Sequence, residues 1–305
     1  MEHIKQHFVD CYQEETGLIS LAAIENPFPY NPLIDGADML LLIITEHAER
    51  SGRTEHLRID GERVLVRTVD RELLRRWIYG GENRSIIQWL ERGQLLIDRN
   101  DYLQNIRQTL LQFPELLREQ KRFIEFASYI RTYLQAKQDL RDGNLLDAYS
   151  NVLAGLHLWA HIVLIEEGHH PELTVWRQIR RVHPGIYKLY EELTTSHETL
   201  EQRVQLVMLA CEFSVMSKMK ACCSLLLRTL SSREEPWSVM ELQNHPTFID
   251  LHVDLSLVLQ KLVSRSYVRE VAFMPESGDP EALELRYLAG VTVESGLADA
   301  SDAIG

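Results

Sequence analysis

The pattern of apolar and polar positions changes twice along the 305 residues of the chain, and each change predicts a new kind of structure. Residues 1–113 mix short β-prone runs with helical stretches, which predicts a small α/β domain. In residues 114–215, apolar side chains recur at steps of three and four, as at Phe123, Phe126 and Ile130. This period predicts amphipathic helices, and the short breaks between them favour an antiparallel bundle.

A third pattern covers residues 216–290, where three helical stretches, the last from Phe248 to Val263, precede two β-prone runs, Tyr267–Phe273 and Ala282–Tyr287. Three helices followed by a hairpin predict a winged-helix-like domain. The final residues, 291–305, are small and acidic with little to bury, so we expect a disordered tail. The fold class predicted for the whole chain is α+β.

The first domain contains clear local signals for strands and turns. Met39–Ile44 is a continuous apolar run, which predicts a central, buried strand. An Asp-Gly pair at 60–61 separates two β-prone runs, Leu57–Ile59 and Val64–Val69, and this is a hairpin signal. Asp70 follows the second run and is the expected N-cap of a helix.

The composition restricts the partners and the compartment. The formal net charge of −13 disfavours unspecific binding to nucleic acid or to an anionic membrane. The start of the chain has no apolar signal segment, and the longest apolar runs are shorter than the ~20 residues that span a bilayer. We therefore expect a cytoplasmic protein. Its four cysteines lack Cys-x-x-Cys spacing and predict reduced, mostly buried thiols rather than a zinc site.

Two aspartates at the start of the buried run are the strongest candidates for chemistry. Asp35 and Asp38 directly precede Met39–Ile44. Carboxylates on a rigid support suit Mg²⁺, because hard divalent cations prefer oxygen ligands. The pair is therefore the candidate catalytic and metal-binding site. A structural interpretation stands beside it, since Asp and Gly are favoured in a turn before a strand whatever the function.

Three segments together carry a resemblance to a known family: Leu33–Leu42 with its two aspartates, the hairpin into Val64–Val66, and Arg92–Arg99, where a glycine precedes a strand ending in Asp-Arg. Their order resembles the bacterial nucleotidyltransferase-like proteins. In that family a degenerate polymerase-β-type nucleotidyltransferase domain precedes a helical domain and a winged-helix-like end. The resemblance extends to about Leu288 and implies a mixed sheet in the first domain and a substrate-binding role for the bundle.

The resemblance also implies an incomplete catalytic motif. Active members of the wider superfamily hold two metal ions on an Asp-x-Asp strand, with a third carboxylate on a neighbouring strand and a Gly-Ser turn for the triphosphate. Here the prolines of Glu25–Pro32 replace Gly-Ser and remove amide donors. Asp38 matches the second aspartate, whereas Gly36 takes the place of the first and Asp35 lies one residue earlier. The strand Val64–Thr68 carries no carboxylate.

Other polar residues have simpler structural interpretations. His157 and His161 lie one helical turn apart, but no paired carboxylate is evident nearby in the sequence, so polar packing is favoured over a metal site. An Arg followed several residues later by a His resembles the pattern of RNA-cleaving helical domains. Basic residues at a helix end, which interact with the helix dipole or with solvent, are the favoured explanation. The residues of that spacing are Arg177, Arg180 and His183.

The third domain is a poor candidate for reading DNA. Its expected recognition helix contains Asp250, His252 and Asp254, whereas contact with phosphate calls for Lys and Arg. Basic residues come only later, at Lys261 and Arg265. The sequence therefore favours packing or protein contact for this domain.

The sequence is compatible with two functions. The first is Mg²⁺-dependent transfer of a nucleoside monophosphate from a nucleoside triphosphate to a hydroxyl acceptor, with Asp35 and Asp38 holding the metal. The second is a catalytically inactive protein that binds a nucleotide or a protein partner and acts in regulation. The missing Gly-Ser and third carboxylate favour the second. Mg²⁺ and a nucleoside triphosphate are cofactors only under the first, and a homo-oligomer is compatible with both.

Overall fold

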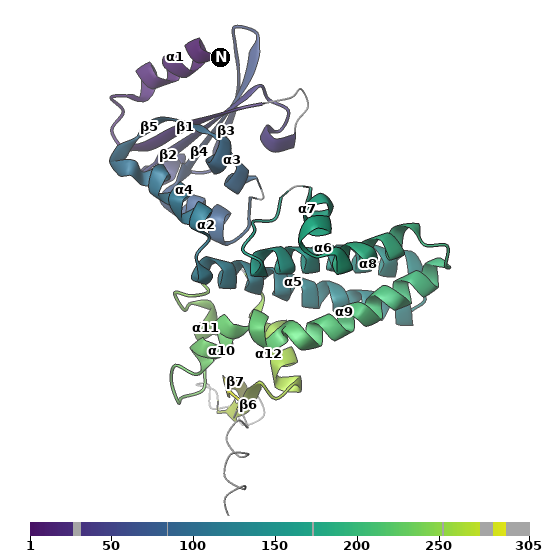
Figure 1. Ribbon diagram of the computed structural model, residues 1–305. Coiled ribbons are helices and arrows are strands. Elements are labelled where there is room, and N and C mark those ends of the chain that lie inside the picture. The colour runs from purple at the N-terminus through teal and green to yellow at the C-terminus, as the bar shows by residue number, and fades with distance from the viewer. Residues whose placement is uncertain (27–31, 84, 173, 252, 275–282, 291–305) are drawn as a thin grey trace, which may run out of the picture. The chain divides into compact units, whose positions relative to one another are not determined.

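The computed structural model describes residues 1–290 apart from 27–31, 84, 173, 252 and 275–282. The chain divides into two compact units, Met1–Leu117 and Arg118–Gly305 (Figure 1). A mixed sheet in the first unit and helices with a small hairpin in the second confirm the α+β class. The tail that the sequence predicts to be disordered lies outside the described residues.

A five-stranded mixed sheet forms the centre of the first unit, in the order β3-β4-β2-β1-β5. The strand β2 runs parallel to β4 and antiparallel to β1, and the other neighbours are antiparallel. Every residue of β2 is buried, as its continuous apolar run predicts for a strand inside a sheet that is covered on both faces. The strands are β1 (Leu18–Glu25), β2 (Met39–Thr45), β3 (Arg53–Ile59), β4 (Glu62–Asp70) and β5 (Gln94–Asp98).

Helices cover both faces of this sheet (Figure 1). Ile4 and Phe8 of α1 pack with alternate residues of the strands, among them Leu41 and Val66. The opposite face is covered by α2, α3 and α4 (Figure 1), and on that side the guanidinium of Arg67 from β4 lies over the ring of Trp89 on α3. These helices are α1 (Glu2–Tyr12), α2 (Arg71–Tyr79), α3 (Ile86–Arg92) and α4 (Tyr102–Gln112), with 3₁₀ turns η1 (Pro32–Ile34), η2 (Ala48–Arg50) and η3 (Arg99–Asp101).

The local signals of the first domain are confirmed. The turn between β3 and β4 has Asp60 at φ 50° and Gly61 at φ 90°, the left-handed backbone of a tight hairpin loop. The side chain of Asp70 accepts a hydrogen bond of 2.7 Å from the amide of Leu73 and caps α2. Asp98 likewise has a structural role, because its carboxylate accepts hydrogen bonds from the first amides of α4.

The second unit contains eight helices and a two-stranded antiparallel sheet among its described residues. The long helices α5, α6 and α9 build the bundle together with α7 and α8, and the remaining elements follow as a helical domain with a hairpin (Figure 1). The elements are α5 (Glu115–Arg141), α6 (Leu145–Glu166), α7 (Val175–Val182), α8 (Pro184–Thr195), α9 (Leu200–Cys222), α10 (Ser224–Leu230), α11 (Val239–Gln243), α12 (Leu255–Ser264), β6 (Val268–Phe273) and β7 (Glu284–Ala289).

The bundle and the C-terminal helices share one hydrophobic core. Phe123 of α5 lies with its ring centroid 5.8 Å from that of Phe248, and Leu226 and Leu259 belong to the same buried cluster. The boundary that the sequence predicts between residues 215 and 216 falls inside α9, because the helical period continues to Cys222 before the chain turns. The two segments therefore pack as a single compact unit.

One helix among the described residues, α6, is long and apolar enough by composition to cross a membrane. Half of its most apolar stretch is buried inside the protein. Val152, Leu156, Ala160 and Val163 all lie in the core of the bundle. An apolar helix with this degree of burial is what the centre of a helical bundle requires.

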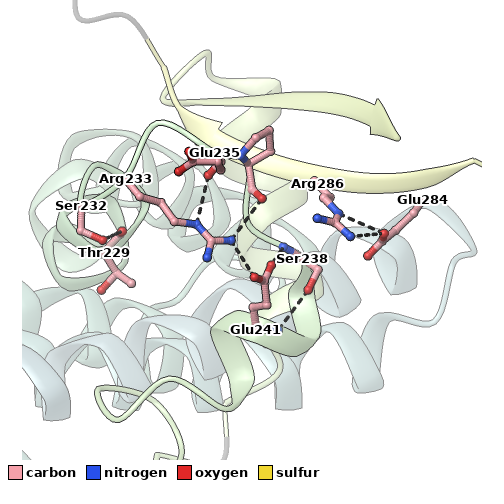
Figure 2. A network of polar contacts seen from close by, with 9 residues as sticks. Thr229, Ser232, Arg233, Glu235, Ser238, Glu241, Glu284 and Arg286 are labelled. Atoms are coloured by element: carbon pink, nitrogen blue, oxygen red, sulfur yellow. Dashed lines mark hydrogen bonds and ion pairs between the residues drawn. The ribbon is translucent and has the colours of Figure 1, made fainter. Parts of the chain in front are cut away.

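Arg233 organises the loop between α10 and α11. Its guanidinium donates hydrogen bonds of 3.2 Å to the carbonyls of Glu235 and Pro236 and one of 2.8 Å to the carboxylate of Glu241 (Figure 2). The same group lies 3.7 Å from the ring centroid of Trp237. One planar side chain therefore fixes two backbone carbonyls, a carboxylate on α11 and an aromatic ring.

Replacing Arg233 with lysine is expected to lower the free energy of unfolding by about 1–2 kcal/mol, because an ammonium group cannot reproduce this planar set of contacts. Urea unfolding followed by tryptophan fluorescence measures the change. Arg269→Lys is the matched control, since Arg269 is exposed on β6 and the same substitution there removes no such network. Equal losses in the two variants would contradict the role given to Arg233.

Candidate functional site

The segment that carries the two aspartates is a tight turn in front of β2. Asp35 and Gly36 both have left-handed backbone, with φ values of 52° and 74°. The amide of Ala37 closes the turn with a hydrogen bond of 3.0 Å to the carbonyl of Ile34. Glycine adopts this conformation at no steric cost and aspartate tolerates it, so the turn by itself accounts for the Asp-Gly pair.

The side chain of Asp35 is directed toward β4. Its Oδ2 accepts a hydrogen bond of 2.6 Å from Nη2 of Arg67. The guanidinium of Arg67 lies 5.2 Å from the ring centroid of Trp89 on α3, and Trp89 Nε1 donates a hydrogen bond of 2.6 Å to the carbonyl of Leu33. A closed chain of contacts thus runs from Leu33 through Trp89 and Arg67 back to Asp35.

Asp38 is also directed toward β4, at the first rung of the parallel ladder. Its Oδ2 accepts a hydrogen bond of 2.8 Å from the amide of Arg63 and lies 3.6 Å from Nε of the same residue. The amide of Asp38 in turn donates to the carbonyl of Arg63 at 2.9 Å. Asp38 therefore fixes the start of β2 against β4, and its charge is offset by Arg63.

The donor set does not fit a Mg²⁺ site. Mg²⁺ requires near-octahedral oxygen ligands, and the carboxylates of Asp35 and Asp38 are each already paired with an arginine. The strand β4 pairs with β2, and its residues Val64–Thr68 include no acid that could act as a third ligand. The charged residue in this stretch is Arg67. Across the described part of the chain, no three His, Cys, Asp or Glu side chains gather in a way that could hold a metal ion.

An open hollow of about 700 Å³ lies between this turn and the β3–β4 hairpin. Arg58 and Arg63 lie directly opposite each other across the hairpin, and His56 pairs with Leu65 next to them. Arg58 is exposed, and no described residue forms an ion pair with it. The hollow is lined by Asp35, Gly36, Ala37, Asp38, His56, Leu57, Arg58, Gly61, Arg63, Val64 and Leu65.

The acidic and basic residues that line this hollow are equal in number. Arg58 and Arg63 line it together with Asp35 and Asp38. Because Asp35 pairs with Arg67, which lies outside the lining, Arg58 has no ion-pair partner among the described residues. Like charges directly opposite on a hairpin repel each other, so Arg58 and Arg63 gain from an anion between them. The arginines were not among the residues that the sequence singled out. The signal available there was a charged residue at position 67 within the apolar run Val64–Val69.

The proline-rich segment that replaces Gly-Ser in the sequence lies largely outside the described residues, at positions 27–31. The neighbouring Asn26 is described, and it ties the end of β1 to the turn. Its amide donates to the carbonyl of Asp38 at 3.0 Å, and its side chain donates to the carbonyl of Ala37 at 2.9 Å.

The histidines of the bundle lie in a polar cluster between helices. His161 Nδ1 is 3.0 Å from Oε1 of Glu125, so the carboxylate that the sequence did not reveal comes from α5. The rings of His157 and His161 are 4.7 Å apart, and His157 meets Trp176 edge to face at 5.8 Å. These contacts agree with polar packing between α5, α6 and α7.

The basic residues near α7 also have structural partners. His183 Nδ1 accepts a hydrogen bond of 3.3 Å from the amide of Ile186 and caps α8. The guanidinium of Arg180 lies 5.4 Å from the ring centroid of Tyr187. Neither side chain lines the hollow beside Asp35 or the pocket between α5 and α12.

The last helix of the C-terminal domain is shorter than the sequence predicts. The expected start at Phe248 is wrong, because α12 begins at Leu255, where the carboxylate of Asp254 accepts a hydrogen bond of 3.0 Å from the amide of Ser256. Asp254 also pairs with Arg131 of α5 at 2.7 Å. This acidic residue therefore caps the helix and attaches it to the bundle, while His252 lies outside the described residues.

Comparison with known families divides the chain into three consecutive parts. A nucleotidyltransferase-like model matches residues 1–118, and a YgxA-like substrate-binding domain model matches residues 119–218. A helix-turn-helix domain model matches residues 224–275. The uncharacterized protein YgxA of Bacillus subtilis is 33% identical over 260 residues, which are 84% of this chain and 88% of that protein.

This chain belongs to the YgxA family of nucleotidyltransferase-like proteins. The chain is also similar to the crystal structure of a nucleotidyltransferase-like protein from Exiguobacterium sibiricum, with 30% sequence identity and a TM-score of 0.84. The match spans 95% of this chain and 99% of that chain. The family and the fold inferred from Leu33–Leu42, the hairpin and Arg92–Arg99 are therefore confirmed. Within the family fold, Asp35 and Asp38 lie in the nucleotidyltransferase-like domain.

Proposed function

We propose that this protein is a catalytically inactive member of the nucleotidyltransferase fold that binds a nucleotide through arginines and without a divalent metal. The observation that carries the proposal is the pairing of both candidate metal ligands with guanidinium groups, Asp35 with Arg67 and Asp38 with Arg63. Phosphoryl transfer depends on cations that neutralise the charge developing on the transferred group. With both carboxylates paired, no cluster of ligands among the described residues is left to position such metal ions.

Binding of phosphate at the same place has positive support. A guanidinium presents a planar fork of donors that matches phosphate oxygens, and Arg58 and Arg63 lie opposite each other on the hairpin and both line the hollow. A hollow of about 700 Å³ falls in the size range of pockets for small ligands. The half-buried side chain of Leu57 adds apolar surface suited to a base.

Isothermal titration calorimetry with each nucleoside triphosphate, with and without Mg²⁺, tests this function. We expect binding that Mg²⁺ does not strengthen, and a loss of roughly tenfold or more in affinity for Arg58→Gln and Arg63→Gln, because each removes a charge-assisted contact to phosphate. Arg53→Gln is the matched control, since Arg53 is exposed on the same strand β3 but does not line the hollow. Absence of nucleotide binding, or an equal loss in the control, would overturn the proposal.

Asp35→Asn separates the inactive from the catalytic interpretation, because the two predict opposite changes in nucleotide affinity. Asparagine tolerates the left-handed backbone of this turn but removes the negative charge beside Arg67. If arginines bind the phosphates, affinity should rise by roughly fivefold. If Asp35 holds a metal ion, Mg²⁺-dependent binding should instead disappear.

A further inference from the structure

The outer face of α9 carries an exposed apolar stripe. Leu206, Leu209 and Phe213 are exposed by 49%, 68% and 76%. Their spacing of three and four residues places them one above another on a single face of the helix. Single exposed leucines are ordinary on a protein surface, but a contiguous stripe of large apolar side chains marks an interaction site.

The opposite face of α9 is firmly packed. Val204, Val207 and Cys211 are at most 2% exposed and belong to the core of the second unit. The hydroxyl of Tyr129 donates a hydrogen bond of 2.8 Å to the carbonyl of Cys211, which fixes the middle of α9 against α5. The rotation of the helix is therefore set, and the stripe cannot turn inward.

The charges beside the stripe are arranged with opposite signs at its two ends. Glu201 is exposed in the first turn of α9, and Lys220 is exposed in the last turn. No described residue forms an ion pair with Lys220. On one flank near the middle, Glu212 is already paired with Lys137 of α5 at 3.2 Å, so a partner helix would meet no unpaired acid there.

We propose that a second copy of this chain binds the stripe, with the two α9 helices antiparallel about a two-fold axis. In an antiparallel pair centred between Leu209 and Phe213, Leu209 of each copy packs against Phe213 of the other copy. The same arrangement brings Glu201 of one copy next to Lys220 of the other, twice. A parallel pair would instead place Glu201 beside Glu201 and Lys220 beside Lys220, and the helix dipoles would be aligned unfavourably.

The size of the stripe fits a reversible dimer. Three side chains with these exposures present on the order of 400 Å² of apolar surface per copy, which is less than the ~800 Å² per partner of a standard stable interface. Exposed polar residues of α9, such as Gln202 and Gln205, supply the remainder. We therefore expect a dissociation constant in the micromolar range.

Sedimentation equilibrium of the full chain over a range of concentrations tests the dimer. The wild-type protein should dimerise, and Leu209→Glu should weaken the dimer by at least 100-fold, because it buries two unpaired charges at the centre of the contact. Leu146→Glu is the matched control, since Leu146 is 73% exposed on α6 and lies outside the stripe. A wild-type protein that stays monomeric up to about 100 µM would overturn the proposal, as would equal dimerisation of Leu209→Glu.

A charge exchange tests the antiparallel arrangement. Glu201→Lys and Lys220→Glu should each weaken the dimer by roughly fivefold, because each removes two weak ion pairs and adds like charges. The double variant should recover the wild-type affinity. A double variant that dimerises more weakly than either single variant would exclude this pairing. Association only with another protein would show that the stripe binds a different partner.

Discussion

Replacing Glu119 with glutamine should lower the free energy of unfolding at pH 7 by about 2 kcal/mol. Glu119 lies on α5 and is 8% exposed. Its carboxylate accepts two hydrogen bonds of 2.6 Å from Arg228 and one of 3.0 Å from Ser224, both on α10. Arg228 is more than half exposed, so the effect is smaller than the loss of a fully buried ion pair.

The same substitution should change how stability depends on pH. The hydrogen bonds from Arg228 hold the pKa of the Glu119 carboxyl below its ordinary value of 4.5, against the opposing effect of burial. A carboxyl whose pKa is lower in the folded than in the unfolded state stabilises the protein above the unfolded pKa. That stabilisation is lost as the pH falls through the folded value. The wild-type protein should therefore lose this contribution below about pH 5, and the glutamine variant should not.

Urea midpoints at pH 7, 5 and 3.5 measure both effects, since the difference in stability between the wild-type protein and Glu119→Gln should shrink toward the lowest pH. Glu191→Gln, an exposed position on α8, is the control for removing one negative charge. Parallel curves for the wild-type protein and Glu119→Gln across this range would contradict the role given to the Arg228 pair.

Local signals were sufficient to predict much of the first domain. The buried run Met39–Ile44, the turn at 60–61 and the cap at Asp70 each act within a few residues, and each is present in the structure. The elements α1 and β1 were not anticipated. The strand β1 holds its place by pairing with both β2 and β5, and pairings between segments so far apart in the chain follow from tertiary packing rather than from local propensity.

The candidate site was predicted only in part, for a related reason. Asp35 and Asp38 stand out because they adjoin an apolar run, whereas their partners depend on the parallel pairing of β2 with β4. Once that register is fixed, Arg67 reaches Asp35 and Arg63 reaches Asp38. A charged residue inside an apolar strand needs a partner, so Arg67 was a usable clue. The partner itself was not determined by the local sequence.

Replacing Trp89 with phenylalanine is expected to cost about 2–4 kcal/mol of stability and to loosen the turn that carries Asp35. Trp89 is 2% exposed, and its Nε1 bonds to the carbonyl of Leu33, two residues before Asp35. Phenylalanine removes this hydrogen bond, opens a small cavity and offers a weaker surface to the guanidinium of Arg67. Loss of stability and loss of order at the site should therefore occur together.

Urea unfolding and hydrogen exchange of the amides at 37 and 38 measure these two effects in one protein. Faster exchange at both amides is expected, because they close the turn and the first rung of the β2–β4 ladder. Trp77→Phe is the matched control, since the Trp77 ring meets Trp89 edge to face at 6.1 Å and phenylalanine can keep that contact. A stability loss in Trp89→Phe without faster exchange at these amides would show that the tryptophan supports the core but does not hold the site.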